Sequence, residues 1–292
     1  MLTPDYIAPE TLEDALIIKS RSGAGARVIA GGTDLILRMR DRVFEPEVLV
    51  DLQRVSLDSI ACDEREMRIG PYVTHSQILA HTGIASLFPA LAESCRQFAG
   101  PPIRNRGTIG GNIVNASPAA DLVPPLMAYD ARIVLRSLSG QRELALADFF
   151  TGPGTTVMEP DEILTEIILP LMPARTASCF LKLGHRRSMA ISIVNLCTRL
   201  SRHADGTLAV VKIVLGAVAP TPLHAVSAEE FLSGKKLSAD QIARAAKLAG
   251  DDSSPISDVR ASGSYRRQMT KVLIRRALTS AWEELAQGDA DD

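Results

Sequence analysis

Two short glycine-containing stretches determine the fold that this sequence predicts. Residues 30–35 read Ala-Gly-Gly-Thr-Asp-Leu, and residues 108–112 read Thr-Ile-Gly-Gly-Asn. Glycine has no Cβ, so backbone N–H groups at such positions can approach a phosphate closely. Either glycine pair alone is more typical of a tight turn than of a phosphate site. The two stretches together predict a pair of loops that grip one pyrophosphate.

Neither stretch matches the best-known nucleotide-binding patterns. The dinucleotide fingerprint G-x-G-x-x-G is absent from both, and the chain contains no G-x-x-x-x-G-K-[ST] run. A Rossmann domain or a P-loop is therefore unsupported, and the glycines need another explanation.

The residues around the first stretch predict a strand followed by a helix. Residues 27–30, Arg-Val-Ile-Ala, predict a short buried strand, and Thr33 or Asp34 is suited to cap a helix that continues through residue 40. Further strands are expected at residues 48–50 and 67–69, and helices near residues 75–81 and 87–98. The run Gly-Pro-Pro at 100–102 cannot continue a helix, so residues 103–115 are expected to cross as a loop or extended segment.

The second half of the chain predicts mainly antiparallel strands and then helices. Residues 131–168 are strand-like, with a turn at Ser139 and Gly140, and the prolines near residues 170–174 favour a domain boundary. Two long apolar runs, 190–201 and 207–217, flank Asp205 and Gly206, which is typical of a hairpin. Helices are expected near residues 238–249 and 262–286.

Composition excludes several classes of protein. With 292 residues the chain is long enough for two domains, and 46% hydrophobic with 23% charged residues is ordinary for a globular protein. A net charge of -2 provides no basic field for nucleic acid. No leader and no apolar run of roughly 20 residues is apparent, so we expect a cytoplasmic protein without a transmembrane segment. The four cysteines and five histidines lack metal-ligand spacing, and no metal site is expected.

A wider set of residues resembles a known family. Residues 104–113 read Arg-Asn-Arg-Gly-Thr-Ile-Gly-Gly-Asn-Ile, and residues 115–121 read Asn-Ala-Ser-Pro-Ala-Ala-Asp. Together with residues 30–35, they resemble the flavin subunit of the xanthine dehydrogenase and carbon monoxide dehydrogenase family of molybdenum hydroxylases. The resemblance continues through residues 151–154, 161–164, 180–183 and 217–222 and reaches Tyr265 and Arg266, so it covers nearly the whole chain.

The resemblance implies an α+β fold with two domains. Residues 1–172 would form a two-part FAD-binding domain of the vanillyl-alcohol-oxidase or PCMH type, with subdomains at about 1–55 and 56–172. Residues 175–286 would form a smaller C-terminal domain, of the molybdenum hydroxylase flavoprotein type, with an antiparallel sheet and helices. Residues 287–292 would be an acidic tail.

The resemblance also implies a noncovalent FAD and the residues that contact it. Backbone donors and short polar side chains of the two loops would hold the pyrophosphate and adjoining groups, Phe98 would lie against the isoalloxazine ring, and Lys182 would lie beside that ring. The implied cofactor-binding residues are Val28, Ile29, Ala30, Gly31, Gly32, Thr33, Asp34, Leu35, Phe98, Thr108, Ile109, Gly110, Gly111, Asn112, Asp121, Leu164 and Lys182.

Several of these residues also have ordinary structural interpretations. Asp121 suits a helix N-cap, Phe98 continues an apolar stripe typical of a core, and Lys182 suits a solvated surface. Residues 185–187, His-Arg-Arg, are compatible with binding nicotinamide phosphates and with a solvated basic turn. Arg104 and Arg106 flank the second loop and are equally suited to face an iron-sulfur partner.

The function implied is electron transfer without a catalytic residue for the organic substrate in this chain. A large molybdenum-cofactor subunit and a small [2Fe-2S] subunit would be separate partners, as a dimer of heterotrimers, and FAD would pass electrons to NAD or another acceptor. The alternatives are a stand-alone FAD-dependent oxidase or dehydrogenase that acts on its own small organic substrate, and a non-catalytic nucleotide-binding module. The hydroxylated substrate stays open, because its pocket would belong to the molybdenum subunit.

Overall fold

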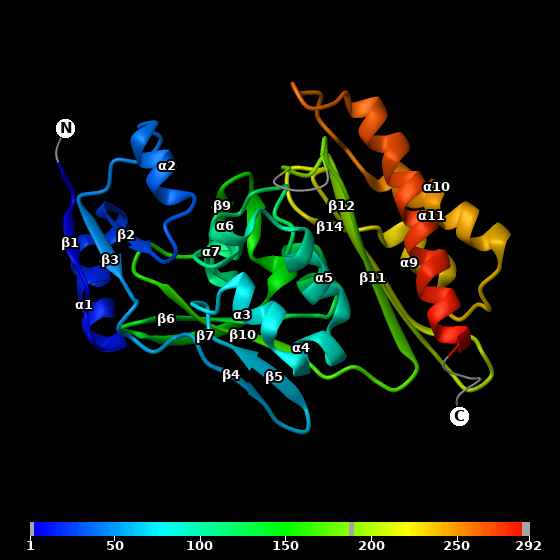
Figure 1. Cartoon of the computed structure of the whole chain (residues 1–292), viewed down its shortest axis with the longest axis horizontal. Coiled ribbons are helices and arrows are strands. Elements are labelled where there is room, and N and C mark those ends of the chain that lie inside the picture. Colours follow the sequence, from blue (N-terminus) through cyan, green and yellow to red (C-terminus); the bar gives the residue numbers. More distant parts are fainter. Residues whose placement is uncertain (1–2, 187–189, 288–292) are drawn as a thin grey trace.

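The structure, a computed structural model, describes residues 3–186 and 190–287 as three regions in a row (Figure 1). An N-terminal region contains a small parallel sheet, and a middle region contains an antiparallel sheet with short helices. A C-terminal region contains a second antiparallel sheet covered by longer helices. The α+β class is confirmed. Residues 288–292 of the expected acidic tail lie outside the described residues.

The N-terminal region is built on three parallel strands in the order β1-β3-β2: β1 (Asp5–Ile7), β2 (Ala26–Ile29) and β3 (Val48–Asp51). Between them lie α1 (Leu12–Ser22), η1 (Gly23–Gly25) and α2 (Leu35–Arg40). The hydroxyl of Thr11 accepts a hydrogen bond from the backbone N–H of Asp14 and so begins α1. Leu16 of α1 packs on Val50 in a small buried core. The strands expected at 27–30 and 48–50 are confirmed.

The middle region has a five-stranded antiparallel sheet in the order β4-β5-β10-β6-β7. Its strands are β4 (Ile60–Cys62), β5 (Glu66–Ile69), β6 (Arg132–Ser137), β7 (Gly140–Ala145) and β10 (Ile163–Pro170). The same region contains six short helices, namely α3 (His75–Ala80), α4 (Thr82–Leu87), α5 (Pro89–Gln97), α6 (Pro101–Arg104), α7 (Ile109–Val114) and α8 (Val123–Ala128). The turn η2 (Leu146–Asp148) and the hairpin of β8 (Phe150–Gly152) and β9 (Thr155–Thr156) complete it.

The expectation of a loop at residues 103–115 is wrong. Helix α5 ends at Gln97, and Pro101 stands in the first turn of α6, where its missing N–H costs nothing because that position has no partner within the helix. Thr108 then begins α7, because its hydroxyl accepts a hydrogen bond from the N–H of Gly111. The second glycine pair is therefore helical backbone rather than a loop.

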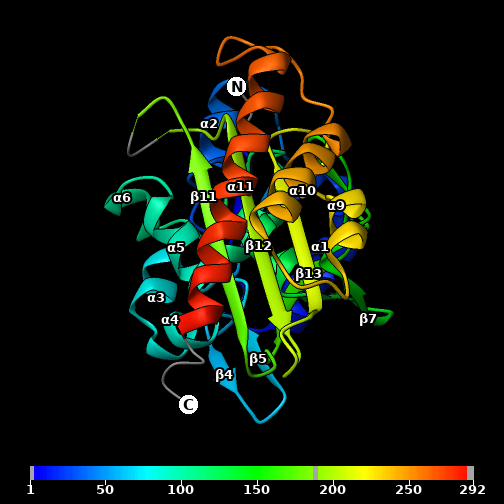
Figure 2. The ribbon, with the colours of Figure 1, turned by 90° about the vertical axis from the view of Figure 1, so that its right-hand side faces the viewer.

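The C-terminal region is an antiparallel sheet in the order β11-β12-β13-β14. Its elements are β11 (Thr176–Leu183), β12 (Val194–Arg202), β13 (Leu208–Gly216), β14 (Leu223–His224), α9 (Val226–Leu232), α10 (Ala239–Asp252) and α11 (Gly263–Gln287). The helices cover one face of the sheet (Figure 2). The other face meets α5 and α8, so β12 is buried almost throughout, which explains its continuous apolar run. The hairpin and both long helices are confirmed. None of the described helices is long and apolar enough to cross a membrane.

Candidate functional site

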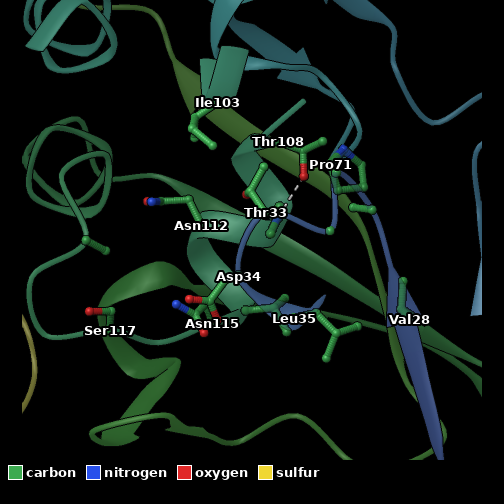
Figure 3. A pocket seen from close by; sticks show the side chains of 18 of the residues that line it. Val28, Thr33, Asp34, Leu35, Pro71, Ile103, Thr108, Asn112, Asn115 and Ser117 are labelled. Atoms are coloured by element: carbon green, nitrogen blue, oxygen red, sulfur yellow. Dashed lines mark hydrogen bonds between the residues drawn. The ribbon is translucent and has the colours of Figure 1, made fainter. Parts of the chain in front are cut away.

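A cavity of about 670 Å³ lies where the three regions meet. Its walls come from β2 and α2, from α7 and the segments beside it, and from the connection between β11 and β12. The lining residues extend from Arg27 and Val28 of β2 in the N-terminal region to Ala190 and Ile191, which precede β12 in the C-terminal region. Figure 3 shows labelled side chains from both glycine segments, among them Thr33, Asp34, Thr108 and Asn112, grouped around this hollow.

Most residues that the sequence assigned to a cofactor line this cavity. They are Val28, Ala30, Gly31, Gly32, Thr33, Asp34, Leu35, Phe98, Thr108, Gly110, Gly111, Asn112, Asp121 and Leu164. Three of the predicted residues do not line it. Ile29 lies in β2, Ile109 is wholly buried in the core, and Lys182 lies behind Asp121.

The first glycine pair brings the two segments into contact. A Cβ on Gly31 would lie 1.7 Å from the carbonyl oxygen of Arg106, so the backbones touch at a point that excludes every other residue type. Gly32 has a φ of +68°, which glycine adopts without steric cost. Within the described chain, the backbone N–H groups of Gly32, Thr33 and Asp34 donate to no protein atom. They are open to an anionic ligand.

The expectation of a side-chain cap on α2 is wrong, although the helix itself is confirmed. Asp34 occupies the N-cap position, but its carboxylate makes no capping hydrogen bond and lies 3.9 Å from the guanidinium of Arg38. The start of this segment is held elsewhere. The hydroxyl of Tyr72 donates to the carbonyl of Ile29 and accepts from the N–H of Leu52, tying the ends of β2 and β3 together.

The second glycine segment differs from expectation, because its backbone donors already have partners. The N–H of Ile109 donates to Val73 O at 2.9 Å, and that of Gly110 to Pro71 O at 2.9 Å. The hydroxyl of Thr108 accepts a hydrogen bond from the N–H of Gly111, and its carbonyl accepts one from the N–H of Asn112. The polar group that remains is the Asn112 side chain, whose Oδ1 is buried without a hydrogen-bond partner in the described chain.

The two glycines of this segment serve different purposes. A Cβ on Gly110 would lie 2.5 Å from Cβ of Pro71, so glycine is needed there for packing. A Cβ on Gly111 would meet only the Thr108 hydroxyl, at 3.0 Å, on the side that lines the cavity. Gly111 is therefore the position at which a ligand can approach this backbone closely.

Asp121 is the centre of a buried polar network at the C-terminal side of the cavity. Its carboxylate accepts hydrogen bonds from Ser192 Oγ at 2.5 Å and from Asn195 Nδ2 at 2.8 Å. Lys182 Nζ lies 2.5 Å from the other carboxylate oxygen, and both side chains are less than a tenth exposed. The alternative of an N-cap is wrong, because Leu122 holds that position of α8. A solvated Lys182 is wrong as well.

Sequence reasoning missed Ser192 and Asn195. Both lie in the predominantly apolar run 190–201, where a polar residue within a predicted buried strand was the available signal, and both are wholly buried in the structure. Their partner Asp121 is more than seventy residues away in the sequence. The contact forms only when the C-terminal sheet packs on α8.

Phe98 packs against the core of the middle region and also lines the cavity, so its core role is confirmed and its contact with the isoalloxazine ring stays a prediction. Its ring centroid lies 4.3 Å from that of His75, a residue that sequence reasoning did not select. His75 is buried, with Nδ1 3.9 Å from Cys95 Sγ. Burial and the nearby Arg104 guanidinium lower the pKa of His75 to about 4, which keeps the ring neutral at physiological pH.

Arg104, one of the two arginines that flank the second glycine segment, has a structural role. Arg104 donates through Nη1 to the carbonyls of Phe98 and Ala99, and thereby supports the Phe98 backbone. His185 and Arg186 are not among the cavity residues, and Arg187 lies outside the described residues. In the described part of the chain no three metal-ligating side chains come together.

Two family models match this chain and together span most of it. Residues 2–172 match a model described as the FAD binding domain in molybdopterin dehydrogenase. Residues 180–281 match the carbon monoxide dehydrogenase flavoprotein C-terminal domain. The residue boundaries of the two domains stay a prediction.

Several similar proteins have names that describe them as subunits or chains of dehydrogenases. The chain is 32% identical to the nicotinate dehydrogenase FAD-subunit of Eubacterium barkeri, over 97% of this chain and 98% of the relative. It is 30% identical to the carbon monoxide dehydrogenase medium chain of Hydrogenophaga pseudoflava, with the same coverage. Among solved structures, quinoline 2-oxidoreductase from Pseudomonas putida 86 superposes with a TM-score of 0.91 at 29% identity, covering 97% of this chain and 98% of the other.

Proposed function

Because the chain belongs to the family of FAD-binding flavoprotein subunits of xanthine dehydrogenase and carbon monoxide dehydrogenase type molybdenum hydroxylases, we propose that it is an electron-transfer subunit. It takes electrons from [2Fe-2S] clusters of a partner subunit and delivers them through FAD to NAD or another acceptor. The observation that carries this proposal is one cavity lined by both glycine segments, with open donors on one side and a buried carboxylate network on the other.

The residues present fit FAD as a noncovalent cofactor. The cavity volume lies in the range of roughly 300–1,000 Å³ that is usual for cofactor sites. The open N–H groups of Gly32, Thr33 and Asp34 suit a pyrophosphate, and the unpartnered Oδ1 of Asn112 suits a ribityl or ribose hydroxyl. Neither glycine segment contains a histidine or cysteine for covalent attachment.

Bound FAD would supply exchange of one or two electrons, which joins single-electron clusters to a two-electron acceptor. The chain's own residues position the cofactor. Phe98 would cover one face of the ring system, and the backbone at Gly111 would allow close approach. Asp121, fixed by three donors, would accept a hydrogen bond from a cofactor group at the C-terminal side. Lys182 would act on the cofactor through Asp121 rather than by direct contact.

The partners proposed are a large molybdenum-cofactor subunit and a small [2Fe-2S] subunit, assembled as a dimer of heterotrimers. The support is that this chain spans nearly the full length of relatives whose names call them an FAD-subunit or a medium chain. The same match, over 97% of this chain, to relatives named as an FAD-subunit and a medium chain favours a subunit over a stand-alone oxidase.

Flavin content and co-purifying chains test this proposal. The purified protein should be yellow, and acid precipitation should release about one FAD per chain into the supernatant. Affinity purification from the native host should recover a molybdenum-containing chain and an iron-sulfur chain. Stoichiometric FMN, flavin that stays with the precipitated protein, or recovery of the chain alone would contradict it.

A further inference from the structure

Arg266 of α11 is the largest of the fully buried side chains in the described part of the chain, and the proposed function gives it no role. Only 2% of its surface is exposed. An arginine is almost never buried to this extent unless its charge and its N–H groups have partners. The charge is paired with Asp258, whose Oδ1 lies 2.7 Å from Nη2. The remaining donors of the guanidinium show what else it holds.

The second terminal nitrogen of Arg266 joins two strands of the C-terminal sheet. Nη1 donates to the carbonyl of Ile193, 2.8 Å away and directly before β12. It also donates to the carbonyl of Ala217, 3.1 Å away and directly after β13. A guanidinium can make these bonds and an ion pair at once, because its five N–H groups point in fixed directions. Arg266 therefore fixes the start of β12 relative to the end of β13.

Ala217 is held in a strained conformation at this junction. Its φ is 61°, in the left-handed region that residues with a Cβ seldom adopt. Its carbonyl accepts from Arg266, and its N–H donates to the carbonyl of Pro118 at 2.7 Å. Strained backbone persists only where surrounding contacts determine it, and it is concentrated near functional sites. The geometry of this junction is therefore specified from both sides.

The contact with Ile193 determines the position of Ser192. Ser192 directly precedes Ile193, and its Oγ donates to the Asp121 carboxylate at 2.5 Å. Arg266 binds the Ile193 carbonyl, and the Ile193 N–H donates to the carbonyl of Leu183 at 2.8 Å. The backbone beside Ser192 cannot rotate without breaking one of these two bonds. The direction of the Ser192 hydroxyl therefore depends on Arg266.

The contact with Ala217 supports Asn195. Gly216 directly precedes Ala217 and lies so close to Asn195 that a Cβ on the glycine would be 1.9 Å from Oδ1 of that side chain. The Asn195 amide is thereby confined beside Asp121, to which its Nδ2 donates at 2.8 Å. Two of the three described donors to Asp121 are therefore supported from behind by the backbone that Arg266 joins.

We propose that Arg266, paired with Asp258, is a positioning residue for the Asp121 carboxylate and thereby fixes the C-terminal wall of the cavity. This inference rests on the proposed function, because the wall matters for electron transfer only when FAD is bound against it. Arg266 does not line the cavity. It acts through Ser192 and Asn195, which hold the carboxylate that does.

A second buried arginine of the same sheet provides a matched control. Arg199 of β12 is 5% exposed, and its Nη2 lies 2.6 Å from Oδ2 of Asp130. Neither Asp130 nor the other contact of Arg199, Met172, lines the cavity. Arg266→Gln and Arg199→Gln each remove a buried cation from a carboxylate, so both should lower the melting temperature. Only Arg266→Gln removes the support behind Asp121.

Hydrogen exchange of the flavin-free chain measures this support without the cofactor. The backbone N–H groups of Ile193 and Ala217 are both hydrogen-bonded, so they exchange only when the junction opens. Arg266→Gln should speed their exchange by about tenfold or more, which corresponds to the loss of a hydrogen bond to a charged group. Arg199→Gln should leave the exchange at these two positions unchanged.

FAD titration then relates the wall to cofactor binding. Arg266→Gln should weaken FAD by about tenfold, whereas Arg199→Gln should bind it as the unmodified chain does. Arg266→Lys keeps the cation beside Asp258 without the planar fork, so it should recover part of both the protection and the affinity. This variant carries the test if Arg266→Gln does not fold, which circular dichroism checks.

Unchanged exchange at Ile193 and Ala217 in a folded Arg266 variant would overturn the positioning role. Equal FAD affinities of the Arg266→Gln and Arg199→Gln chains would do the same, because the loss of a buried cation would then explain both. Failure of the unmodified chain to bind FAD would instead overturn the proposed function, and the exchange measurement would still decide whether Arg266 holds the wall.

Discussion

At the scale of single residues, three of the cavity's glycines are needed for different physical reasons. Gly31 permits two backbones to touch, Gly110 makes room for Pro71, and Gly111 leaves space on the cavity side. The sequence shows the same residue at each position and cannot distinguish these roles. Only the third role concerns a ligand directly.

Replacing Gly111 by valine should remove FAD and leave the fold largely intact. The branched side chain would occupy the space through which the cofactor approaches, whereas the helical φ of Gly111 poses no obstacle to a side chain. FAD titration should show a loss of about tenfold or more. Gly31→Ala is the contrasting variant, because a Cβ clashing with Arg106 O should lower the free energy of unfolding by about 1–3 kcal/mol. Unchanged FAD affinity in folded Gly111→Val would contradict this role.

The ion pair between Lys182 and Asp121 should matter more for stability than the surface pairs do. Lys182→Met would leave a buried carboxylate without its cation, and we expect the free energy of unfolding to fall by about 3 kcal/mol. Lys212→Met is the control, because its pair with Asp130 is much more exposed and should contribute below about 1 kcal/mol. Urea unfolding measures both. Adding Asp121→Asn to Lys182→Met should restore part of the loss, and no recovery would argue against the charge explanation.

His75 predicts a pH dependence of stability. Its pKa is near 4 in the folded chain, below the usual value of 6.5, so the unfolded chain binds more protons between these values. Stability should therefore fall as pH falls from about 6.5 to 4, by roughly 3 kcal/mol in total from this residue. His75→Gln should flatten that part of the stability profile, and His203→Gln, at an exposed position, should not. Identical profiles for the two variants would contradict the assignment.

At the scale of elements, periodicity predicted β2, β3, the hairpin of β12 and β13, and the helices α10 and α11. It failed at α6 and α7, where proline and glycine usually mark a loop. There the deciding features were a proline in a first helical turn and the Thr108 cap, both of which depend on exact local geometry. It also did not identify β11 as a strand, although residues 180–183 carried part of the family resemblance.

The cap at Thr108 should be measurable. Thr108→Val keeps the shape of the side chain but removes the oxygen that accepts from Gly111, and should lower the free energy of unfolding by about 1 kcal/mol. FAD affinity should fall with it, since α7 carries Gly111 and Asn112 into the cavity. Thr151→Val, in an exposed strand position, serves as the control. A Thr108 variant as stable as this control would show that packing alone holds α7.

At the scale of the whole molecule, the candidate site depends on packing between distant regions. The two glycine segments could be predicted from sequence because their residue types follow a recognisable pattern. The partners of Asp121 and the neutral state of His75 could not be predicted, because their contacts are created by tertiary folding. The C-terminal region in particular supplies Ser192 and Asn195, which hold a carboxylate of the FAD-binding domain in place.

Anaerobic flavin reduction tests the central claim, that this chain transfers electrons and leaves substrate oxidation to its partners. The purified FAD-loaded chain is mixed with candidate purines, N-heterocycles, aldehydes or carbon monoxide, alone and with its reconstituted partners, while flavin absorbance is followed. We expect an artificial reductant or NADH to bleach the flavin of the isolated chain, and an organic substrate to bleach it only when the partners are present. Rapid bleaching of the isolated chain by one of these substrates would contradict the account and establish a stand-alone oxidase or dehydrogenase.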